Sequence, residues 1–384
     1  MAIISDVVPQ GLVLLSDPLK FKFTMTGLIN VNTYSRFGYQ LLDSSDNEIT
    51  VEEAFTPIEG VSFPLVFKKD VYDRVYTAKP QTAIISRAEP EMFLDVKLNY
   101  WEQQFDTTTC ESSKAGEQTL STYRILNSTY QYWGSIESVS NKYIPLTYCP
   151  PDILMGRNNV TSYYFYAKEE ITVTIETRTK AGVQQGFTDI TFPIGAHSIL
   201  IDPSLVPGFD SDTDRINLTI PSTITPPTEQ LVRVRLTECN LEETIWFQSF
   251  AGGYQAMHFD CIDRRRVKRK STEVCRYIEP SVYPNDIEIQ EGGLSIIDVE
   301  ASEEITLVKF LKKDDLDNIR WYESFLNSKS YLWDFEEYAR NIVDPRNLVK
   351  VLPKGGTLTI FEDDDLVELS FTFIVNQKYN TPNV

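Results

Sequence analysis

Residues 264–270 form the one strong charge anomaly in an acidic chain of 384 residues. The cations of this run are Arg264, Arg265, Arg266, Lys268, Arg269 and Lys270. Such a run can bind nucleic acid, or it can contact an acidic patch on a partner subunit. DNA affinity depends on cations that displace condensed counterions, whereas the chain has a formal net charge of −19. We therefore predict that this run binds a partner protein, and nucleic acid is not the expected ligand.

Histidine and cysteine offer few ways to build a metal centre. The sequence has two histidines, His197 and His258. His258, Cys261 and Cys275 have the ligand types that suit zinc, but they lack a fourth ligand and the short paired spacing of structural zinc sites. A strand after a hairpin with one inward-facing thiol is the favoured interpretation, and we predict no zinc site.

An acidic segment has the alternate carboxylates of a calcium loop. Asp210, Asp212 and Asp214 occupy every second position, but the sixth position is Arg215 and the twelfth is Pro221. An EF-hand loop requires glycine and glutamate at those two places. We therefore predict an acidic turn without calcium, and we expect no cofactor or metal anywhere in the chain.

Motifs of the familiar enzyme classes do not occur in the sequence. It contains no Gly-x-Ser-x-Gly elbow, no phosphate-binding loop that ends in Lys-Ser/Thr, and no His-Glu-x-x-His. A carboxylate pair for glycoside hydrolysis stays possible, because 55 acidic residues provide many pairs that only their spacing in space would distinguish. We predict that the chain is not an enzyme.

Clustered aromatic residues permit two interpretations. The two clusters consist of Tyr123, Tyr130, Tyr132, Trp133 and, further along, Tyr163, Tyr164 and Tyr166. They could stack on sugars, which would make the chain a carbohydrate- or receptor-binding adhesin module. Aromatic cross-strand pairs explain the same density without a ligand, and we favour that packing role.

The pattern of apolar residues predicts the strands that must position these side chains. Phe21, Phe23 and Met25 alternate with polar residues, and so do Ile171, Val173 and Ile175. Near the end of the chain a helical stripe consists of Leu316, Ile319, Tyr322, Phe325 and Leu326. We predict a mainly β protein with tandem antiparallel β-sandwich-like domains, followed by a small α+β C-terminal domain.

Turn-rich and proline-rich segments predict the domain boundaries. The segment 221–227 is the best linker candidate, because proline cannot donate ladder hydrogen bonds. The predicted parts are an arm at 1–16, a β-sandwich at 17–90, a second β-domain at 91–224, a hairpin-containing segment at 225–280 and the α+β domain at 281–384. The hairpin-containing segment completes or follows the second β-domain. The arm is expected to acquire structure by lying on another surface.

Hydropathy predicts no contact with a membrane. No window approaches the roughly twenty apolar residues of a membrane span, and no basic n-region precedes an apolar stretch at the start. We therefore expect a protein that is kept in a cytoplasm or released by lysis. The cysteines are odd in number and widely spaced, which favours reduced thiols: Cys110, Cys149, Cys239, Cys261 and Cys275.

A hairpin is predicted where Gly252 and Gly253 follow the strand 244–250, because glycine tolerates the positive φ of a tight reversal. The segment from Ile245 to Tyr254, with the return Met257-His258-Phe259, resembles a motif in structural proteins of phages and prophages of Bacteroidetes. In that family a Trp-Leu-Asn-like strand reaches a Gly-Gly-aromatic turn. Here Gln248 replaces the usual asparagine.

The resemblance extends over most of the chain through few specific residues. The opening strand 17–21, the segment from Leu316 through Trp333 and the closing strand 368–373 look like parts of the same family. The resemblance implies a virion structural protein of the tail, the baseplate or the head-to-tail adaptor. It further implies other virion structural proteins as partners and a homo-oligomeric ring.

Overall fold

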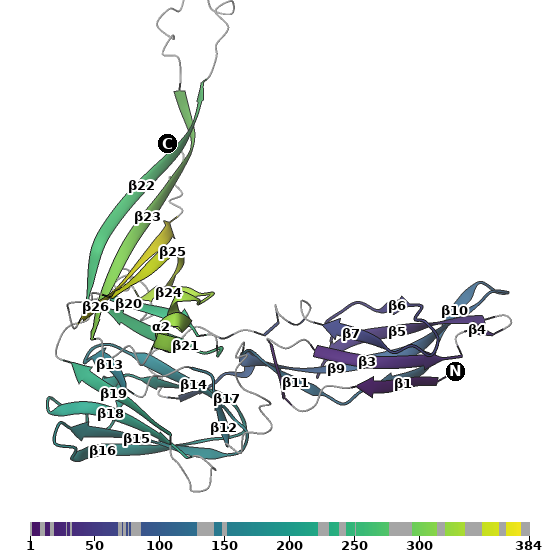
Figure 1. The fold of residues 1–384 in the computed structure, drawn as a ribbon, viewed down its shortest axis with the longest axis horizontal. Coiled ribbons are helices and arrows are strands. Elements are labelled where there is room, and N and C mark those ends of the chain that lie inside the picture. The colour runs from purple at the N-terminus through teal and green to yellow at the C-terminus, as the bar shows by residue number, and fades with distance from the viewer. Residues whose placement is uncertain are drawn as a thin grey trace, which may run out of the picture. The chain divides into compact units, whose positions relative to one another are not determined.

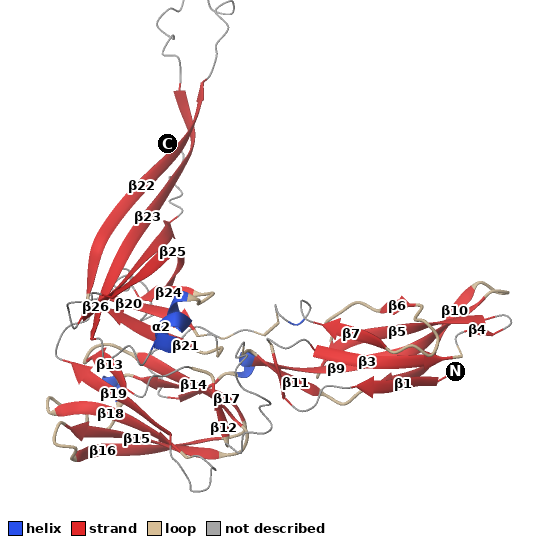
Figure 2. Cartoon of the chain, viewed as in Figure 1, coloured by secondary structure: helices blue, strands red, loops and turns tan. Residues whose placement is uncertain are grey.

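The computed structural model describes most of the chain and shows a mainly β protein (Figure 2). The described residues are 2–7, 12–15, 19–27, 29–30, 33–67, 71, 74–75, 77, 86–128, 142–147, 152–221, 230–237, 243–249, 251–275, 294–312, 319–334, 348–360 and 366–377. Antiparallel sheets dominate these residues, and a short helix accompanies the C-terminal strands (Figure 1). The predicted fold class is therefore confirmed.

The chain forms two compact units. Unit 1 contains Met1–Leu154, Val160–Leu236 and Gln248–Gln255, and unit 2 contains Met155–Asn159, Thr237–Phe247 and Ala256–Val384. The chain thus returns to unit 1 for eight residues around the predicted Gly-Gly turn.

The first part of unit 1 is a pair of sheets around an aromatic core. A three-stranded sheet has the order β1-β3-β7, and a larger sheet has the path β2-β11-β9-β5-β4, with β10 on β9 and β6 on β5. The strands are β1 (Ala2–Val7), β2 (Leu12–Leu14), β3 (Leu19–Thr26), β4 (Ile29–Asn30), β5 (Thr33–Asp43), β6 (Glu53–Phe55), β7 (Phe63–Phe67), β9 (Phe93–Asp106), β10 (Glu111–Thr119) and β11 (Tyr123–Leu126). Phe21, Phe23 and Met25 are buried in this core, as their alternation predicts.

Strand pairing in this part crosses two of the predicted boundaries. Strand β9 pairs with β5 from Asp106 opposite Thr33 to Val96 opposite Asp43, so one sheet includes strands from both sides of residue 90. Strands β1 and β2 lie within the predicted arm, and they pair with β3 and β11 of the same chain. Whether each predicted range folds as a domain by itself stays a prediction.

The second part of unit 1 contains a four-stranded sheet, β12-β14-β17-β8, and a five-stranded sheet, β13-β19-β18-β15-β16. The strands are β8 (Ser86–Ala88), β12 (Tyr143–Pro145), β13 (Asp152–Gly156), β14 (Thr161–Ala167), β15 (Ile171–Thr179), β16 (Gln184–Phe192), β17 (Gly195–Ile201), β18 (Thr213–Ile220) and β19 (Gln230–Thr237), with short 3-10 helices η1 (Pro90–Met92) and η3 (Pro203–Leu205). The rings of Phe165 and Phe192 meet edge to face at 5.0 Å, which joins residues of the two sheets. Most of the predicted linker 221–227 lies outside the described residues.

Unit 2 is built on a sheet of order β21-β20-β24-β25-β26-β23-β22. Its elements are β20 (Glu243–Gln248), β21 (Tyr254–Phe259), β22 (Cys261–Cys275), β23 (Leu294–Lys312), α2 (Ile319–Leu326), β24 (Tyr331–Asp334), β25 (Leu348–Ile360) and β26 (Leu366–Gln377). Ile319, Tyr322, Phe325 and Leu326 of the predicted stripe lie in α2, whereas Leu316 lies outside the described residues. Buried Phe325 packs its ring against those of Phe247, Tyr331 and Phe371. One face of the sheet therefore holds the core of unit 2.

Candidate functional site

The predicted Gly-Gly turn connects β20 to β21 and lies among residues of unit 1. Ser249 donates its backbone N–H to the Gly253 carbonyl at 2.8 Å, and Gly252 donates to the Ser249 carbonyl at 2.9 Å. Gly252 has a φ of +109°, which favours glycine, and a Cβ there would lie 1.9 Å from the Asn127 carbonyl oxygen. Gly253 is required for a different reason, because its Cβ would lie 2.5 Å from the Cβ of Tyr164.

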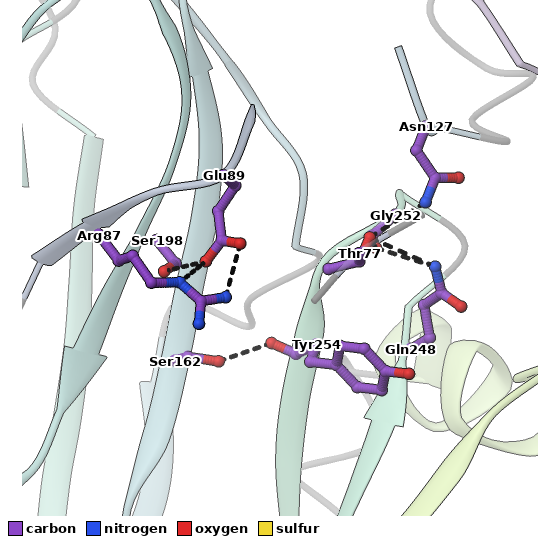
Figure 3. Close-up of polar contacts among 9 residues, drawn as sticks. All are labelled: Thr77, Arg87, Glu89, Asn127, Ser162, Ser198, Gln248, Gly252 and Tyr254. Carbon is purple, nitrogen blue, oxygen red and sulfur yellow. Dashed lines mark hydrogen bonds and ion pairs between the residues drawn. The ribbon is translucent and has the colours of Figure 1, made fainter. Parts of the chain in front are cut away.

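Polar side chains tie this turn into unit 1 (Figure 3). The Thr77 hydroxyl donates to the Gly252 carbonyl at 2.6 Å, and the Gln248 amide donates to the same oxygen at 3.1 Å. Asn127 Nδ2 in turn donates to Thr77 Oγ1 at 3.1 Å. These buried bonds satisfy groups that would otherwise be costly to bury, so the arrangement is a structural connection.

A second polar cluster in unit 1 surrounds the carboxylate of Glu89, which is fully buried. Arg87 donates through Nε at 2.8 Å and through Nη2 at 2.6 Å, and the Ser198 hydroxyl donates at 2.6 Å (Figure 3). Arg87 and Glu89 are two residues apart, so their side chains leave the same face of an extended segment. Sequence reasoning missed this pair; the Arg-x-Glu spacing indicates only that the two side chains share a face, and the burial of Glu89 follows from the fold.

The two histidines occupy separate, buried environments. His197 Nε2 lies 2.8 Å from the Pro193 carbonyl oxygen, and burial lowers the pKa of its imidazole. His258 Nδ1 lies 2.9 Å from the Thr244 hydroxyl. In the described part of the chain, no group of three or more His, Cys, Asp or Glu side chains could hold a metal ion. The side chain of Cys275, a predicted zinc ligand candidate, is outside that part.

The acidic segment around Asp210 forms a turn. The Asp210 carboxylate accepts hydrogen bonds from the Gln185 amide at 2.7 Å and from the Asp212 backbone N–H at 2.8 Å, and these bonds lower its pKa. The carboxylate thus organises its own loop, as expected for an acidic turn.

The aromatic clusters divide between buried and undescribed residues. Tyr123, Tyr163, Tyr164 and Tyr166 are all buried, which fits a packing role. Tyr130, Tyr132 and Trp133 lie outside the described residues. No helix of the described part is long and apolar enough to cross a membrane.

The predicted basic run lies on β22, which pairs antiparallel with β23. Arg264 is opposite Thr306, Arg265 opposite Ile305 and Arg266 opposite Glu304; then Lys268, Arg269 and Lys270 are opposite Ser302, Ala301 and Glu300. The side chains of Arg264 and Arg266 are exposed. The side chains of Arg265, Lys268, Arg269 and Lys270 lie outside the description, so their contribution stays a prediction.

Arg264 and Arg266 line a polar groove of about 450 Å³ on the sheet of unit 2. Four adjacent strands contribute to this groove: β22, β23, β26 and β25. The other lining residues are Glu304, Thr306, Lys354, Gly355, Gly356, Thr357, Ser370 and Thr372. We call this feature the basic groove, because three cations line it beside one carboxylate. Sequence reasoning found the two arginines but missed the partners on the other strands.

One ion pair and one hydrogen bond between threonine hydroxyls organise the floor of the basic groove. Lys354 Nζ lies 2.9 Å from Glu304 Oε1, and the hydroxyls of Thr306 and Thr372 lie 3.0 Å apart. Thr306 and Thr372 are directly opposite in the ladder between β23 and β26. The groove therefore presents cations at the side of β22 and β25 and hydroxyl groups between them.

No family model matches the sequence, and no curated protein matches it. The chain has 10% identity and a TM-score of 0.22 to a structure titled as the tail of an empty GTA particle, over 35% of this chain and 91% of that one. The periplasmic chaperone SfaE gives 9% identity and a TM-score of 0.23 over 62% and 99% of the two chains. The calcium-binding domain CBD12 of CALX1.1 gives 11% identity and a TM-score of 0.20, over 62% of this chain and 100% of that one. Similarities this weak carry no argument about function.

Proposed function

We propose that this chain is a structural protein of a tailed bacteriophage particle and acts through protein–protein interfaces. The tail, the baseplate and the head-to-tail adaptor are the positions that the resemblance to Bacteroidetes phage proteins implies. In this proposal the chain is not an enzyme, its partners are other virion structural proteins, and copies of it form a ring.

The observation that carries the proposal is the position of β22 at the end of its sheet. An edge strand presents backbone N–H and C=O groups that can pair with a strand of another chain. Cys261–Cys275 makes this edge long, and Arg264 and Arg266 are exposed along it. A long edge with cations along it is suited to a specific protein contact, because the charges select the partner and oppose wrong pairings.

The Gly-Gly turn supports the family part of the proposal. Gly252 and Gly253 are both required by close contacts in unit 1, so the segment that carries the resemblance also has a structural role in this chain. A family of structural proteins with this turn would need glycine at the same two places.

The experiment is to measure the mass of the full purified chain in solution by light scattering, and to look for the chain in purified phage particles by mass spectrometry. The proposal expects a closed oligomer, or a stable presence in particles with neighbouring structural proteins. A chain that stays monomeric and is absent from every particle preparation would contradict it.

A further inference from the structure

The basic groove contains two guanidinium groups that are available to a ligand. Among the residues that the structure describes, no carboxylate lies within ion-pair distance of Arg264 or Arg266, whereas Lys354 is paired with Glu304 at 2.9 Å. An exposed guanidinium has a planar fork of N–H donors that matches the two oxygens of a carboxylate. We infer that the basic groove binds an extended, acidic segment of a partner subunit, with carboxylates on alternate residues that pair with Arg264 and Arg266.

The spacing of the two arginines selects an extended ligand. Arg264 and Arg266 both line the groove and are two residues apart on β22, which corresponds to about 7 Å along a strand. Alternate side chains of an extended peptide have the same spacing and leave the same face. A helical ligand would instead bring together residues three or four apart. The groove therefore fits an acid-x-acid pattern on a strand.

Among the described strands, β22 pairs on one side only, with β23, and its other edge supplies the backbone part of this recognition. A strand added beside β22 would place its side chains about 5 Å from those of Arg264 and Arg266 in cross-strand pairs. Opposite charges in such pairs stabilise the pairing. Backbone hydrogen bonds would provide affinity, and the two arginines would provide specificity.

The hydroxyl groups of Thr306 and Thr372 lie on β23 and β26, two and three strands in from a strand added outside β22, so they set the polar character of the sheet face beside the arginines and do not bind that strand directly. In the pair formed by Thr306 and Thr372, one hydroxyl donates to the other, which leaves the proton of the acceptor free to donate outward. The Glu304 carboxylate, which is paired with Lys354, is negatively charged and repels a further ligand carboxylate placed next to it. The site thus favours a few placed carboxylates over a continuous run of negative charge.

Net charge favours a protein ligand over a nucleic acid. The chain carries −19, so it repels a duplex with one charge per about 1.7 Å of axis more strongly than a short peptide with a few carboxylates. The inference rests on the proposed function, because it specifies what an interface of that kind recognises.

The test uses the full chain and a fluorescent seven-residue peptide with Glu at its second, fourth and sixth positions and Thr elsewhere. Fluorescence anisotropy should show saturable binding. A peptide of the same composition with Glu at the first, fourth and seventh positions has no acid-x-acid pair, and it should bind at least about fivefold more weakly because one carboxylate contact is lost. Equal binding of the two peptides would overturn the inference.

Variants locate the binding. Arg264→Gln and Arg266→Gln should each weaken binding of the alternating peptide by about tenfold, since each removes a charge-assisted pair. Lys350→Gln is the matched control, because Lys350 is an exposed cation on β25 that does not line the groove. It should change binding by less than about twofold, as expected for a distant surface charge. Equal loss in all three variants would show a general charge effect and overturn the inference.

Charge exchange provides a second, independent check. The double variant Arg264→Glu with Arg266→Glu should lose the Glu–Thr peptide and bind the corresponding Lys–Thr peptide. Displacement of the peptide by a short DNA duplex or by inorganic phosphate at lower concentration than unlabelled peptide would identify a phosphate site and overturn the inference. Assembly into particles without any peptide binding would refute this inference alone, whereas peptide binding by a chain that never assembles would refute the proposed function.

Discussion

Gly252 combines a positive φ with a close backbone contact, so two separate penalties oppose any side chain there. A Cβ would lie 1.9 Å from the Asn127 carbonyl oxygen. Gly60 has a φ of +72° but nothing within 4 Å of an added Cβ, so Gly60→Ala measures the backbone strain by itself. We expect Gly60→Ala to lower the free energy of unfolding by about 1 kcal/mol and Gly252→Ala to lower it by about 3 kcal/mol or more. Urea titration of both variants checks this, and equal losses would show that the contact with Asn127 has no energetic weight.

His197 should make stability depend on pH. Its folded-state pKa is below its ordinary value of 6.5 because the imidazole is buried. The unfolded chain therefore takes up a proton near pH 6.5 while the folded chain does not, and the free energy of unfolding falls as pH decreases from about 6.5 toward the folded pKa. The slope from this group is at most about 1.4 kcal/mol per pH unit. Well above pH 6.5 neither state holds the proton, and the slope from this group vanishes.

Denaturant titrations between pH 5.5 and 7.5 check this expectation in the His197→Gln variant, whose amide can still donate to the Pro193 carbonyl. The slope should decrease in His197→Gln. His258→Gln leaves His197 in place and should retain the His197 part of the slope. An unchanged pH profile in His197→Gln would contradict the assignment.

Strand β8 is held beside β17 by the cluster around Glu89, so disrupting this cluster should destabilise the sheet that contains both strands. The backbone pairs join Ala88 to His197 and Ser86 to Ile199, while Arg87 and Ser198 donate to the Glu89 carboxylate. Arg87→Met would leave a buried carboxylate without its cation, which costs about 3 kcal/mol or more. Adding Glu89→Gln to that variant should recover part of the loss, because a neutral amide is cheaper to bury than a charge.

A second ion pair provides the control for this prediction. Arg178 and Glu176 on β15 have the same two-residue spacing, with Arg178 Nε 2.6 Å from Glu176 Oε1, but their side chains are more exposed. Arg178→Met should therefore destabilise the protein much less than Arg87→Met, because solvent screens the exposed pair. Chemical denaturation of the variants decides the comparison. If Arg87→Met and Arg178→Met destabilise equally, burial of Glu89 is not the cause.

Two compact units, each with its own buried aromatic residues, should unfold in more than one step. Phe325 is fully buried in unit 2, and its replacement by Ala removes ring contacts with Phe247 and Phe371. Calorimetry of Phe325→Ala should show that one transition moves to lower temperature by the equivalent of about 3 kcal/mol or more. Phe23→Ala, in the core of unit 1, should move a different transition. A single transition that shifts in the same way in both variants would show that the units unfold together.

Local patterns in the sequence predict much of the secondary structure. The alternation of Ile171, Val173 and Ile175 predicts β15, and the stripe that includes Tyr322 and Phe325 predicts α2; all five side chains are buried. Period two and period 3.6 are properties of neighbouring residues, so they can be recognised without knowledge of the fold. The Gly-Gly turn was predicted on the same basis, but only the structure shows that Gly253 is required by contact with Tyr164.

The basic groove shows what local patterns leave undecided. Arg264, Thr306, Thr372 and Gly355 come together because β22, β23, β26 and β25 pair in one particular register. A shift of one residue in any of these strands would turn its side chains to the other face.

Composition and periodicity therefore predicted a mainly β chain with a basic run near residue 264. Tertiary structure alone decided that this strand lies at a sheet edge, which hydroxyl groups and which ion pair stand beside it, and that Glu89 is buried with Arg87. The physical reason is that pairing between distant strands depends on contacts summed over the folded chain, whereas the preference for a strand is set residue by residue.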